Sequence, residues 1–475
     1  MSDARALHFF AGKGGVGKTT LATAFALNLA EKFPKEKVLL ISADGSQTLS
    51  DLLKKKLSAT PTALIPGKGD GVLAAAEWDA SASLPPFLQR YEPALRQAVV
   101  KGGLLSEDEL EAILAQSFAG LEEAVFLLGL QRDLEDGTWN RIVVDTAPTA
   151  HMLRIVDLPA GLRKFLGLVR SAEGKAKKDA DPTFLDEVSA WVDKLVALLK
   201  DPARTSFHLV ALPEPVPEAQ TRMYFSRLME RGLPVAEILV NQVEDREGCP
   251  ACQGRRGLQA PHVRKLQALD KNVPVQLIGK REVPPRGLED LRKLAKDCAS
   301  GKDTKALAFA AAEGPPALVR APSMPPIAAP PIPPTRLIFF VGQGGVGKSS
   351  CAAAAAVTLT EKEGPVLLIS TDPAHSLSDV LQSRLTDTET QVKGTKGLYA
   401  RELDVAAWFS GLRKRWKDKA ERGLEALKPS EVAWDREVLR NLLDSAPPAI
   451  DELAALSALT DALVQERFKR IVVDP

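Results

Sequence analysis

The string G-K-G-G-V-G-K-T-T at residues 12–20 returns as G-Q-G-G-V-G-K-S-S at residues 342–350. Each copy follows a short apolar stretch, residues 7–10 and 337–341, and runs into an Ala- and Leu-rich stretch with a helical pattern. A glycine-rich loop between a strand and a helix lets backbone N–H groups surround a phosphate at the helix N-terminus. The chain is therefore predicted to carry two phosphate-binding loops (P-loops), which restricts it to the α/β class.

Within each loop the chemistry assigns separate roles. Lys18 and Lys348 place a positive charge near the β- and γ-phosphates of a nucleotide, and Thr19 and Ser349 offer a hydroxyl to Mg²⁺. The loop residues predicted to contact ATP are Gly12, Gly14, Gly15, Val16, Gly17, Lys18, Thr19, Thr20, Gly342, Gly344, Gly345, Val346, Gly347, Lys348, Ser349 and Ser350.

The repeat extends beyond the loops. L-L-I-S-A-D ends at Asp44, 26 residues after Lys18, and L-L-I-S-T-D ends at Asp372, 24 residues after Lys348. R-I-V-V-D ends at Asp145 in the first copy and again at Asp474 in the second. Strands that are apolar throughout belong to a parallel sheet covered on both faces. The pattern predicts two tandem P-loop NTPase domains, each with a mostly parallel, doubly wound sheet.

The predicted domains are residues 1–310 and 336–475, each with an inserted helical subdomain, at about 84–135 and 406–465. Residues 311–335 contain nine prolines and no periodic pattern, which predicts a semi-rigid linker. Since the second copy stops just after its R-I-V-V-D, we expect it to be incomplete and the sequence to be a fragment.

Composition limits the partners. The net charge of +1 gives no electrostatic indication of nucleic-acid binding, and 45% hydrophobic with 26% charged residues is typical of globular proteins. The first strand follows the N-terminus directly, and no apolar run reaches the length of a membrane span, so we expect a cytoplasmic protein. Four cysteines do not make a disulfide framework.

Further segments carry a family resemblance. S-T-D-P-A-H-S-L-S-D at 370–379 and D-T-A-P-T-A-H-M-L-R at 145–154 resemble the switch I and switch II segments of the ArsA family of deviant Walker A ATPases. V-A-L-P-E-P-V-P-E-A-Q-T-R at 210–222, V-N-Q at 240–242 and C-P-A-C-Q-G-R-R at 249–256 resemble other segments of that family. The family includes arsenical pump ATPases and the Get/TRC ATPases that deliver tail-anchored membrane proteins.

The resemblance implies roles for individual residues. Lys13 is similar to the lysine that reaches across a dimer to the partner's nucleotide, and Asp44 and Asp372 to the aspartates that orient the attacking water. Asp145 would hold Mg²⁺ through water, and Asn241 would read the adenine. The remaining residues with an implied switch role are His151, His375 and Asp379.

Cys249 and Cys252 form a C-x-x-C pair in a loop-like segment. Two thiolates at this spacing supply half of a tetrahedral zinc site. Two interpretations stay open: zinc shared across an interface with a second pair, as the resemblance implies, and a pair of reduced thiols without metal.

The resemblance implies a Mg²⁺-dependent ATPase in which ATP drives two facing halves, or a homodimer, to open and close on a cargo or membrane partner. The alternative is a nucleotide-switched regulator or scaffold with slow turnover. Arsenite efflux is disfavoured, because the predicted helical insertions contain no cysteine to bind As(III). Residues 121–130 are apolar enough to line a cargo groove, but a helix facing its own core explains them equally well.

The two sites are predicted to be unequal. The first half keeps Lys13 but reads D-G-S-Q-T-L-S-D at switch I, where the family commonly has D-P-A-H-S-L-S-D. The second half keeps that segment from Asp372 but has Gln343 in place of the lysine. In facing halves, Lys13 would complete the second site, and the first site would receive only a neutral side chain.

Overall fold

The computed structural model describes residues 5–43, 47–79, 89, 121–146, 182–246, 250–300, 332–342, 346–371, 376–405, 407–412, 414 and 450–475. These residues form two compact units, one from the described residues up to 300 and one from those after 331.

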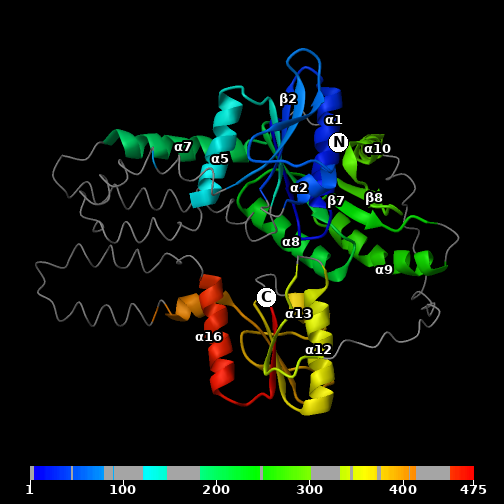
Figure 1. Ribbon diagram of the computed structural model, residues 1–475, viewed down its shortest axis with the longest axis vertical. Coiled ribbons are helices and arrows are strands. Elements are labelled where there is room, and N and C mark those ends of the chain that lie inside the picture. The colour runs from blue at the N-terminus through cyan, green and yellow to red at the C-terminus, as the bar shows by residue number, and fades with distance from the viewer. Residues whose placement is uncertain are drawn as a thin grey trace, which may run out of the picture. The chain divides into compact units, whose positions relative to one another are not determined.

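The first unit is built on an eight-stranded sheet in the order β3-β4-β2-β5-β1-β6-β7-β8 (Figure 1). All neighbouring strands are parallel except β3, which runs antiparallel to β4. The strands are β1 (Leu7–Ala11), β2 (Lys37–Ser42), β3 (Thr62–Pro66), β4 (Val72–Glu77), β5 (Arg141–Asp145), β6 (Thr205–Ala211), β7 (Val235–Val243) and β8 (Val275–Gly279).

Helices cover both faces of this sheet. One core packs beneath α1 (Lys18–Lys32), α2 (Thr48–Leu53) and α10 (Gly287–Ser300), and includes Phe10 and Phe25. The other packs beneath the remaining helices and includes Phe9 and Phe207. Those helices are α5 (Leu121–Glu135), α7 (Pro182–Lys200), α8 (Pro215–Glu230) and α9 (Pro250–Gln267). Because both faces are covered, β1, β5 and β6 are buried at every residue, as their uninterrupted apolar character predicts.

The helix α5 contains the apolar segment 121–130, for which the sequence left open a cargo groove or a helix facing its own core. Its Phe126, Leu127 and Leu130 are buried in the sheet core, next to Trp78. These side chains therefore face their own core, which is the interpretation that required no cargo groove.

The second unit repeats the first half of this architecture in a five-stranded sheet of order β11-β12-β10-β13-β9. Its strands are β9 (Leu337–Phe339), β10 (Val366–Ser370), β11 (Thr390–Gln391), β12 (Leu398–Glu402) and β13 (Arg470–Asp474). One core lies under α12 (Lys348–Glu363) and α13 (Ser376–Val380), and another under α16 (Ile450–Val464). Among the described residues of this unit, no strand takes the place of β6, β7 or β8.

An equivalent ion pair lies at the amino end of the sheet in each unit. Arg141 at the start of β5 contacts Glu36 at 2.5 Å, and Arg470 at the start of β13 contacts Glu363 at 2.7 Å. Each arginine also donates to a carbonyl just before the first strand, that of Arg5 or Thr335. The tandem duplication and the mostly parallel α/β fold are thus confirmed down to individual side chains.

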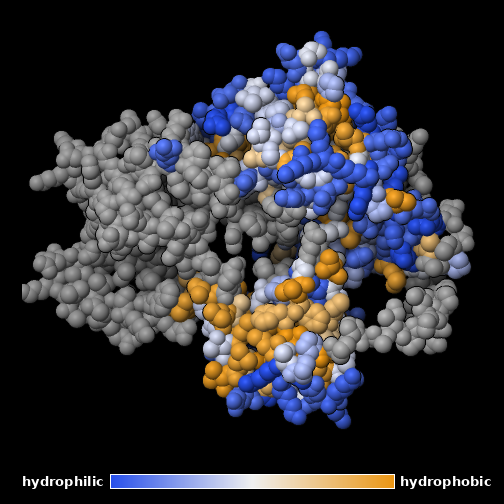
Figure 2. Space-filling model, in the orientation of Figure 1, coloured by the Kyte–Doolittle hydropathy of each residue, from blue (hydrophilic) through white to orange (hydrophobic). Residues whose placement is uncertain are grey.

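Hydrophobic side chains reach the surface on the second unit, where Figure 2 shows them in the region of α16. Leu453, Leu456 and Val464 of that helix are exposed. The described helices include none that is both apolar enough and long enough to cross a bilayer. The predicted linker at 311–335 and most of both predicted helical insertions lie outside the described residues, so the predicted domain boundaries stay predictions.

Candidate functional site

The first P-loop joins β1 to α1 at the carboxyl edge of the sheet. Gly17 immediately precedes α1 with a left-handed backbone, φ 95°, a conformation that favours glycine. At Gly12 the main chain of β6 approaches so closely that an added Cβ would lie 2.2 Å from the carbonyl oxygen of Val210. The glycines of the motif are therefore needed both for the turn and for the neighbouring strand.

Asn241 braces this loop from β7. Its Nδ2 donates to the carbonyl oxygen of Val16 at 2.8 Å, and its Oδ1 accepts from the backbone N–H of Gln242 at 2.9 Å. An added Cβ on Gly17 would lie 2.4 Å from the same Nδ2. The family resemblance suggested adenine reading for Asn241, and the bracing contact was not anticipated from the sequence, since Val16 lies 225 residues away.

In both units the side chain of the P-loop lysine donates to a carbonyl oxygen of its own loop. Nζ of Lys18 donates to the carbonyl oxygen of Lys13 at 3.2 Å, and Nζ of Lys348 to that of Gly342 at 3.0 Å. An ammonium group has three N–H donors, so these bonds are compatible with further contacts to phosphate oxygens. Both lysines begin a helix, as the motif predicts.

The second loop is more open than the first. Val16 is 1% exposed, whereas its counterpart Val346 is 64% exposed. Among the described residues, nothing lies within 4 Å of an added Cβ at Gly347, and the three atoms nearest to one at Gly342 belong to the side chains of Val346 and Lys348. The wall that β6 and β7 supply to the first loop has no equivalent among the described residues of the second unit.

Several neighbouring strands beside the first loop end in a polar residue. Asp145 at the end of β5 is aligned with Phe10 of β1 on one side and with Ser42 of β2 on the other. Ser42 is in turn aligned with Glu77 of β4. Asp145 is 1% exposed, and the next residue, Thr146, donates its hydroxyl to the carbonyl oxygen of Phe10 at 2.7 Å. The carboxylate is therefore held deep in the crevice at the carboxyl ends of the strands, where ligands of such sheets bind.

The second unit repeats this row. Asp474 at the end of β13 is aligned with Ser370 of β10, which is aligned with Glu402 of β12. Asp474 is 1% exposed. Asp379 lies in α13, directly after Ser378, which donates to Glu402. Several predicted residues lie outside the described residues: Asp44, His151, Cys249, Gln343, Gly344, Gly345, Asp372 and His375.

The donors near the first loop fit Mg²⁺ by their chemistry. Mg²⁺ prefers hard oxygen ligands and keeps several waters, so the Thr19 hydroxyl and the buried Asp145 carboxylate form a suitable set. Zinc is different: among the described residues, no group of three or more His, Cys, Asp or Glu side chains could hold a metal. Cys252 lies in the first turn of α9, and the described residues alone do not make a zinc site.

A buried polar chain crosses three neighbouring strands, β1, β6 and β7. Oε1 of Glu237 contacts Nδ1 of His208 at 2.8 Å, and Nε2 of His208 contacts Oγ of Ser206 at 3.0 Å. Oγ of Ser206 contacts Nδ1 of His8 at 2.8 Å, and Nε2 of His8 contacts the carbonyl oxygen of Arg5 at 3.0 Å. The sequence assigned no function to His8 or His208.

A carbonyl oxygen only accepts hydrogen bonds, so Nε2 of His8 carries the hydrogen in its contact with Arg5. Burial, and then the charge of His208, lower the pKa of His8 well below its ordinary value. Burial acts to raise the pKa of Glu237, but the hydrogen bond and charge of His208 outweigh it and lower that pKa.

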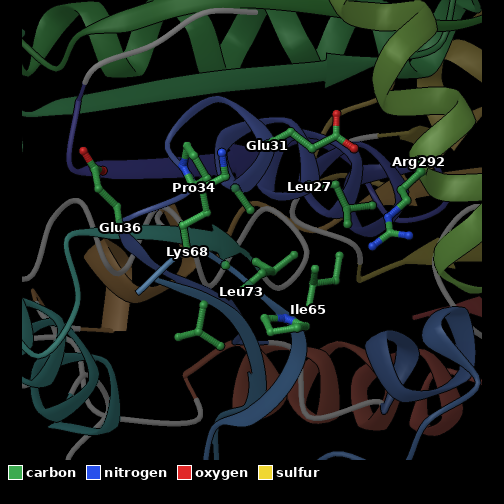
Figure 3. Close-up of a pocket in the computed structure, with 12 residues that line it drawn as sticks. Leu27, Glu31, Pro34, Glu36, Ile65, Lys68, Leu73 and Arg292 are labelled. Atoms are coloured by element: carbon green, nitrogen blue, oxygen red, sulfur yellow. The ribbon is translucent and has the colours of Figure 1, made fainter. Parts of the chain in front are cut away.

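A separate pocket of about 250 Å³ opens at the opposite edge of the first sheet (Figure 3). It is lined by Leu27 and Glu31 of α1, by Pro34 and Glu36 before β2, and by Lys68 between β3 and β4. Because this edge holds the amino ends of the parallel strands, the pocket is not part of the P-loop site.

Comparison with known proteins identifies the family. The sequence profile of the family described as anion-transporting ATPase (ArsA) matches residues 5–299 and again residues 335–475. The chain belongs to this ArsA family. The two matched segments coincide with the two units that carry the P-loops. As a member of a family of P-loop ATPases the chain is an ATP hydrolase, and Mg²⁺ and ATP are the cofactor and substrate that such an enzyme requires.

Some relatives match nearly the whole chain and others match only part of it. A putative arsenical pump-driving ATPase from Halobacterium salinarum is 25% identical over 495 residues, which cover 98% of this chain and 71% of the relative. The ATPase ARSA1 of Chlamydomonas reinhardtii is 26% identical, covering 98% of this chain and 63% of its own length. The ATPase GET3 of Komagataella phaffii is 27% identical over 311 residues, 61% of this chain and 88% of the relative.

Proposed function

We propose that this ATPase couples ATP binding and hydrolysis to the opening and closing of two facing halves, and through them to a cargo or membrane partner. The observation that carries the proposal is the equivalence of the two units. Each has a P-loop lysine lying over its own loop and a buried aspartate at the end of the central R-I-V-V-D strand. Two equivalent nucleotide units in one chain are what a pair of facing halves requires.

In the proposed reaction, the γ-phosphorus of ATP is attacked by water, and the bond to the oxygen bridging to the β-phosphate breaks. Lys18 or Lys348 stabilises charge on the phosphate oxygens, while backbone N–H groups of the loop hold them in place. Asp44 or Asp372 orients the water, and Thr19 with Asp145, or Ser349 in the second unit, holds Mg²⁺. Bound Mg²⁺ neutralises charge on the β- and γ-phosphate oxygens.

The cargo is proposed only by class. Names of relatives point to an arsenical pump in one case and to GET3 in another. Arsenite would need several thiolates close together, and the described cysteines do not provide such a group. We therefore favour a protein cargo or membrane partner. Zinc enters this proposal only as a metal shared between two copies, to which each Cys249–Cys252 pair would give two ligands.

A regulator with slow turnover is the second candidate, supported by Gln343 and by the altered switch I segment of the first half. ATP turnover of the full chain, measured alone, with lipid vesicles and with arsenite, separates the candidates. The Lys18→Ala/Lys348→Ala double variant is the background control. Stimulation by vesicles supports the coupled ATPase, an unstimulated slow rate supports the regulator, and stimulation by arsenite would overturn our choice of cargo.

A further inference from the structure

In both units a serine and a glutamate make the same two hydrogen bonds, and the pair, Ser50–Glu77 or Ser378–Glu402, is called the junction. In the first, the backbone N–H of Ser50 donates to Oε1 of Glu77 at 2.9 Å, and its hydroxyl donates to Oε2 at 2.9 Å. In the second, Ser378 makes the same two bonds to Glu402, at 2.7 and 2.6 Å. Both oxygens of each carboxylate are thus used by a single serine.

The serine is also fixed on its other side. Its Oγ accepts a bond from the backbone N–H seven residues later, that of Leu57 at 3.0 Å or Leu385 at 3.2 Å. Its carbonyl oxygen accepts from the N–H five residues later, that of Lys55 or Ser383, at 3.1 Å. Every hydrogen-bonding group of each serine, main chain and side chain, is therefore occupied by a partner that the repeat has kept.

The glutamate connects this serine to the end of the neighbouring strand. Glu77 is aligned with Ser42, the last residue of β2, and the next residue, Trp78, donates to the carbonyl oxygen of Ser42 at 2.8 Å. In the second unit Glu402 is aligned with Ser370, and Leu403 donates to the carbonyl oxygen of Ser370 at 3.1 Å. One strand end, at β4 or β12, thus holds both ends of the connection from the second strand to the following helix.

That connection has the same length in both units: seven residues separate Ser42 from Ser50, and seven separate Ser370 from Ser378. It includes the aspartate to which the proposed function gives the attacking water, Asp44 or Asp372. An ordinary helix cap would need one hydrogen bond from a side chain to an N–H. Here a carboxylate accepts two hydrogen bonds from one serine and links the helix to the neighbouring strand end. This is more than a helix cap requires.

We propose that Glu77 and Glu402 are positioning residues for ATP hydrolysis, which, through Ser50 and Ser378, set the span of the connection that carries the water-orienting aspartate. This inference rests on the proposed function. Phosphoryl transfer is catalysed mainly by placement and charge, and misplacement by about 1 Å can cost on the order of a hundredfold in rate. The junction therefore acts on turnover and leaves the P-loop, on another strand, free to bind nucleotide.

The test uses the full chain with both junctions altered, so that it does not depend on which site turns over faster. Ser50→Ala/Ser378→Ala removes both hydroxyls, and Ser50→Thr/Ser378→Thr keeps them. The matched control, Ser58→Ala/Ser383→Ala, removes two serine hydroxyls that follow the same helices and bond to groups 2 residues away. Measurements are kcat and KM for ATP, the Kd of ADP, and the melting temperature.

We expect the Ser→Ala pair to lower kcat by roughly tenfold to a hundredfold with little change in the Kd of ADP, and the Ser→Thr pair and the control to stay near wild type. Unchanged kcat in the Ser→Ala pair, or an equal loss in the control, overturns the inference. If the Ser→Ala pair does not fold, Glu77→Gln/Glu402→Gln takes its place under the same criteria.

Failure of the proposed function gives a different result, because the wild type would then turn over ATP slowly and without stimulation by vesicles. In that case hydrogen exchange of peptides spanning 43–57 and 371–385 decides about the junction. Faster exchange in the Ser→Ala pair than in the control, with a nucleotide-dependent difference at the same peptides, supports positioning. Equal exchange overturns it.

Discussion

The side-chain amide of Asn241 donates to the carbonyl oxygen of Val16 at 2.8 Å, which ties the end of β7 to the P-loop of the first unit. The loop is thus braced by a strand on the far side of β6, and the brace explains why Gly17 has no room for a side chain. Two properties of the site, the shape of the loop and its support, therefore depend on a contact between distant parts of the sequence.

We expect Asn241→Ala to weaken the binding of ATP and of tripolyphosphate equally, because the variant loses a brace of the phosphate-binding loop. A hydrogen bond of this kind contributes about 0.5–1.5 kcal/mol, or up to roughly tenfold in Kd. Titration calorimetry with both ligands measures the effect. The control is Asn140→Ala, which removes a side-chain bond to the N–H of Lys37 at the amino end of β2. Weaker binding of ATP alone would instead support adenine reading by Asn241.

The two P-loops should respond differently to the same glycine change. Gly12→Ala places a methyl group against the carbonyl oxygen of Val210, whereas the described atoms nearest to a methyl group in Gly342→Ala belong to side chains, the first at 3.2 Å. In a protein of residues 1–475, we expect Gly12→Ala to abolish nucleotide binding at the first site and Gly342→Ala to weaken the second site much less. Binding stoichiometry of a fluorescent ATP analogue measures both. Equal losses would mean that the wall beside the first loop does not constrain it.

Each P-loop lysine should be needed for its own site. Lys18→Ala and Lys348→Ala each remove a charge-assisted contact worth about 1.5–3 kcal/mol, which is on the order of tenfold to a hundredfold in affinity. Equilibrium binding of ATP to each single variant and to the double variant checks this. Full stoichiometry and affinity in Lys18→Ala would exclude the first loop as a nucleotide site.

The position of the two P-loops in the fold could be predicted from the sequence, because a P-loop string, an apolar strand before it and a helix after it are local features. R-I-V-V-D likewise placed Asp145 and Asp474 at buried strand ends. What the sequence could not show were contacts between distant strands. Nothing in the composition distinguished Glu77 or Glu402 from a surface carboxylate, although the repeated L-S-D at 49–51 and 377–379 was a signal that alignment of the halves contained.

The buried histidines show the same limit. His8 and His208 occur on strands that pattern alone describes as apolar, and only the pairing of β1 with β6 brings them together. Their partners Ser206 and Glu237 come from two strands as well. Interpreting each histidine by itself gave no basis for predicting a hydrogen-bonded chain across three strands.

The buried hydrogen-bonded groups, His8 and Glu237 above all, predict how the stability of the protein depends on pH. Because the pKa of His8 is lowered in the folded state, by burial first and by His208, Arg141 and Arg5 as well, the unfolded chain binds more protons. Stability is then present above about pH 6.5, the ordinary value for histidine, and falls as the pH drops below it, by at most about 1.4 kcal/mol per pH unit for one proton. Glu237, whose pKa is also lowered, adds a loss below about pH 4.3.

Urea unfolding between pH 7.5 and 5.5 measures the slope, and His8→Asn removes the titrating group. We expect the variant to be less stable at pH 7.5, since a buried network loses a member, but to have a smaller slope of stability against pH. The same slope in variant and wild type would place the pH dependence elsewhere in the protein.

The most demanding prediction concerns inequality of the two sites. Lys13 is present in the first loop, whereas the second loop has Gln343 at the same position. If the halves face each other, Lys13 completes the second site and Gln343 leaves the first without a cation. A missing cation at a phosphoryl-transfer transition state can cost about 10³ or more in rate. We therefore expect the second site to hydrolyse ATP and the first to bind it with slow turnover.

In the full chain, Asp372→Asn and Lys13→Ala should each remove most ATP turnover, whereas Asp44→Asn should change it little. The converse variant is more informative: on the Asp372→Asn background, Gln343→Lys supplies the first site with the cation it lacks, and turnover should partly return. Steady-state rates at saturating ATP measure all four proteins, with binding stoichiometry as the check that both sites still take up nucleotide. Equal losses from Asp44→Asn and Asp372→Asn would show two equivalent sites, and the difference between Lys13 and Gln343 would then have no catalytic meaning.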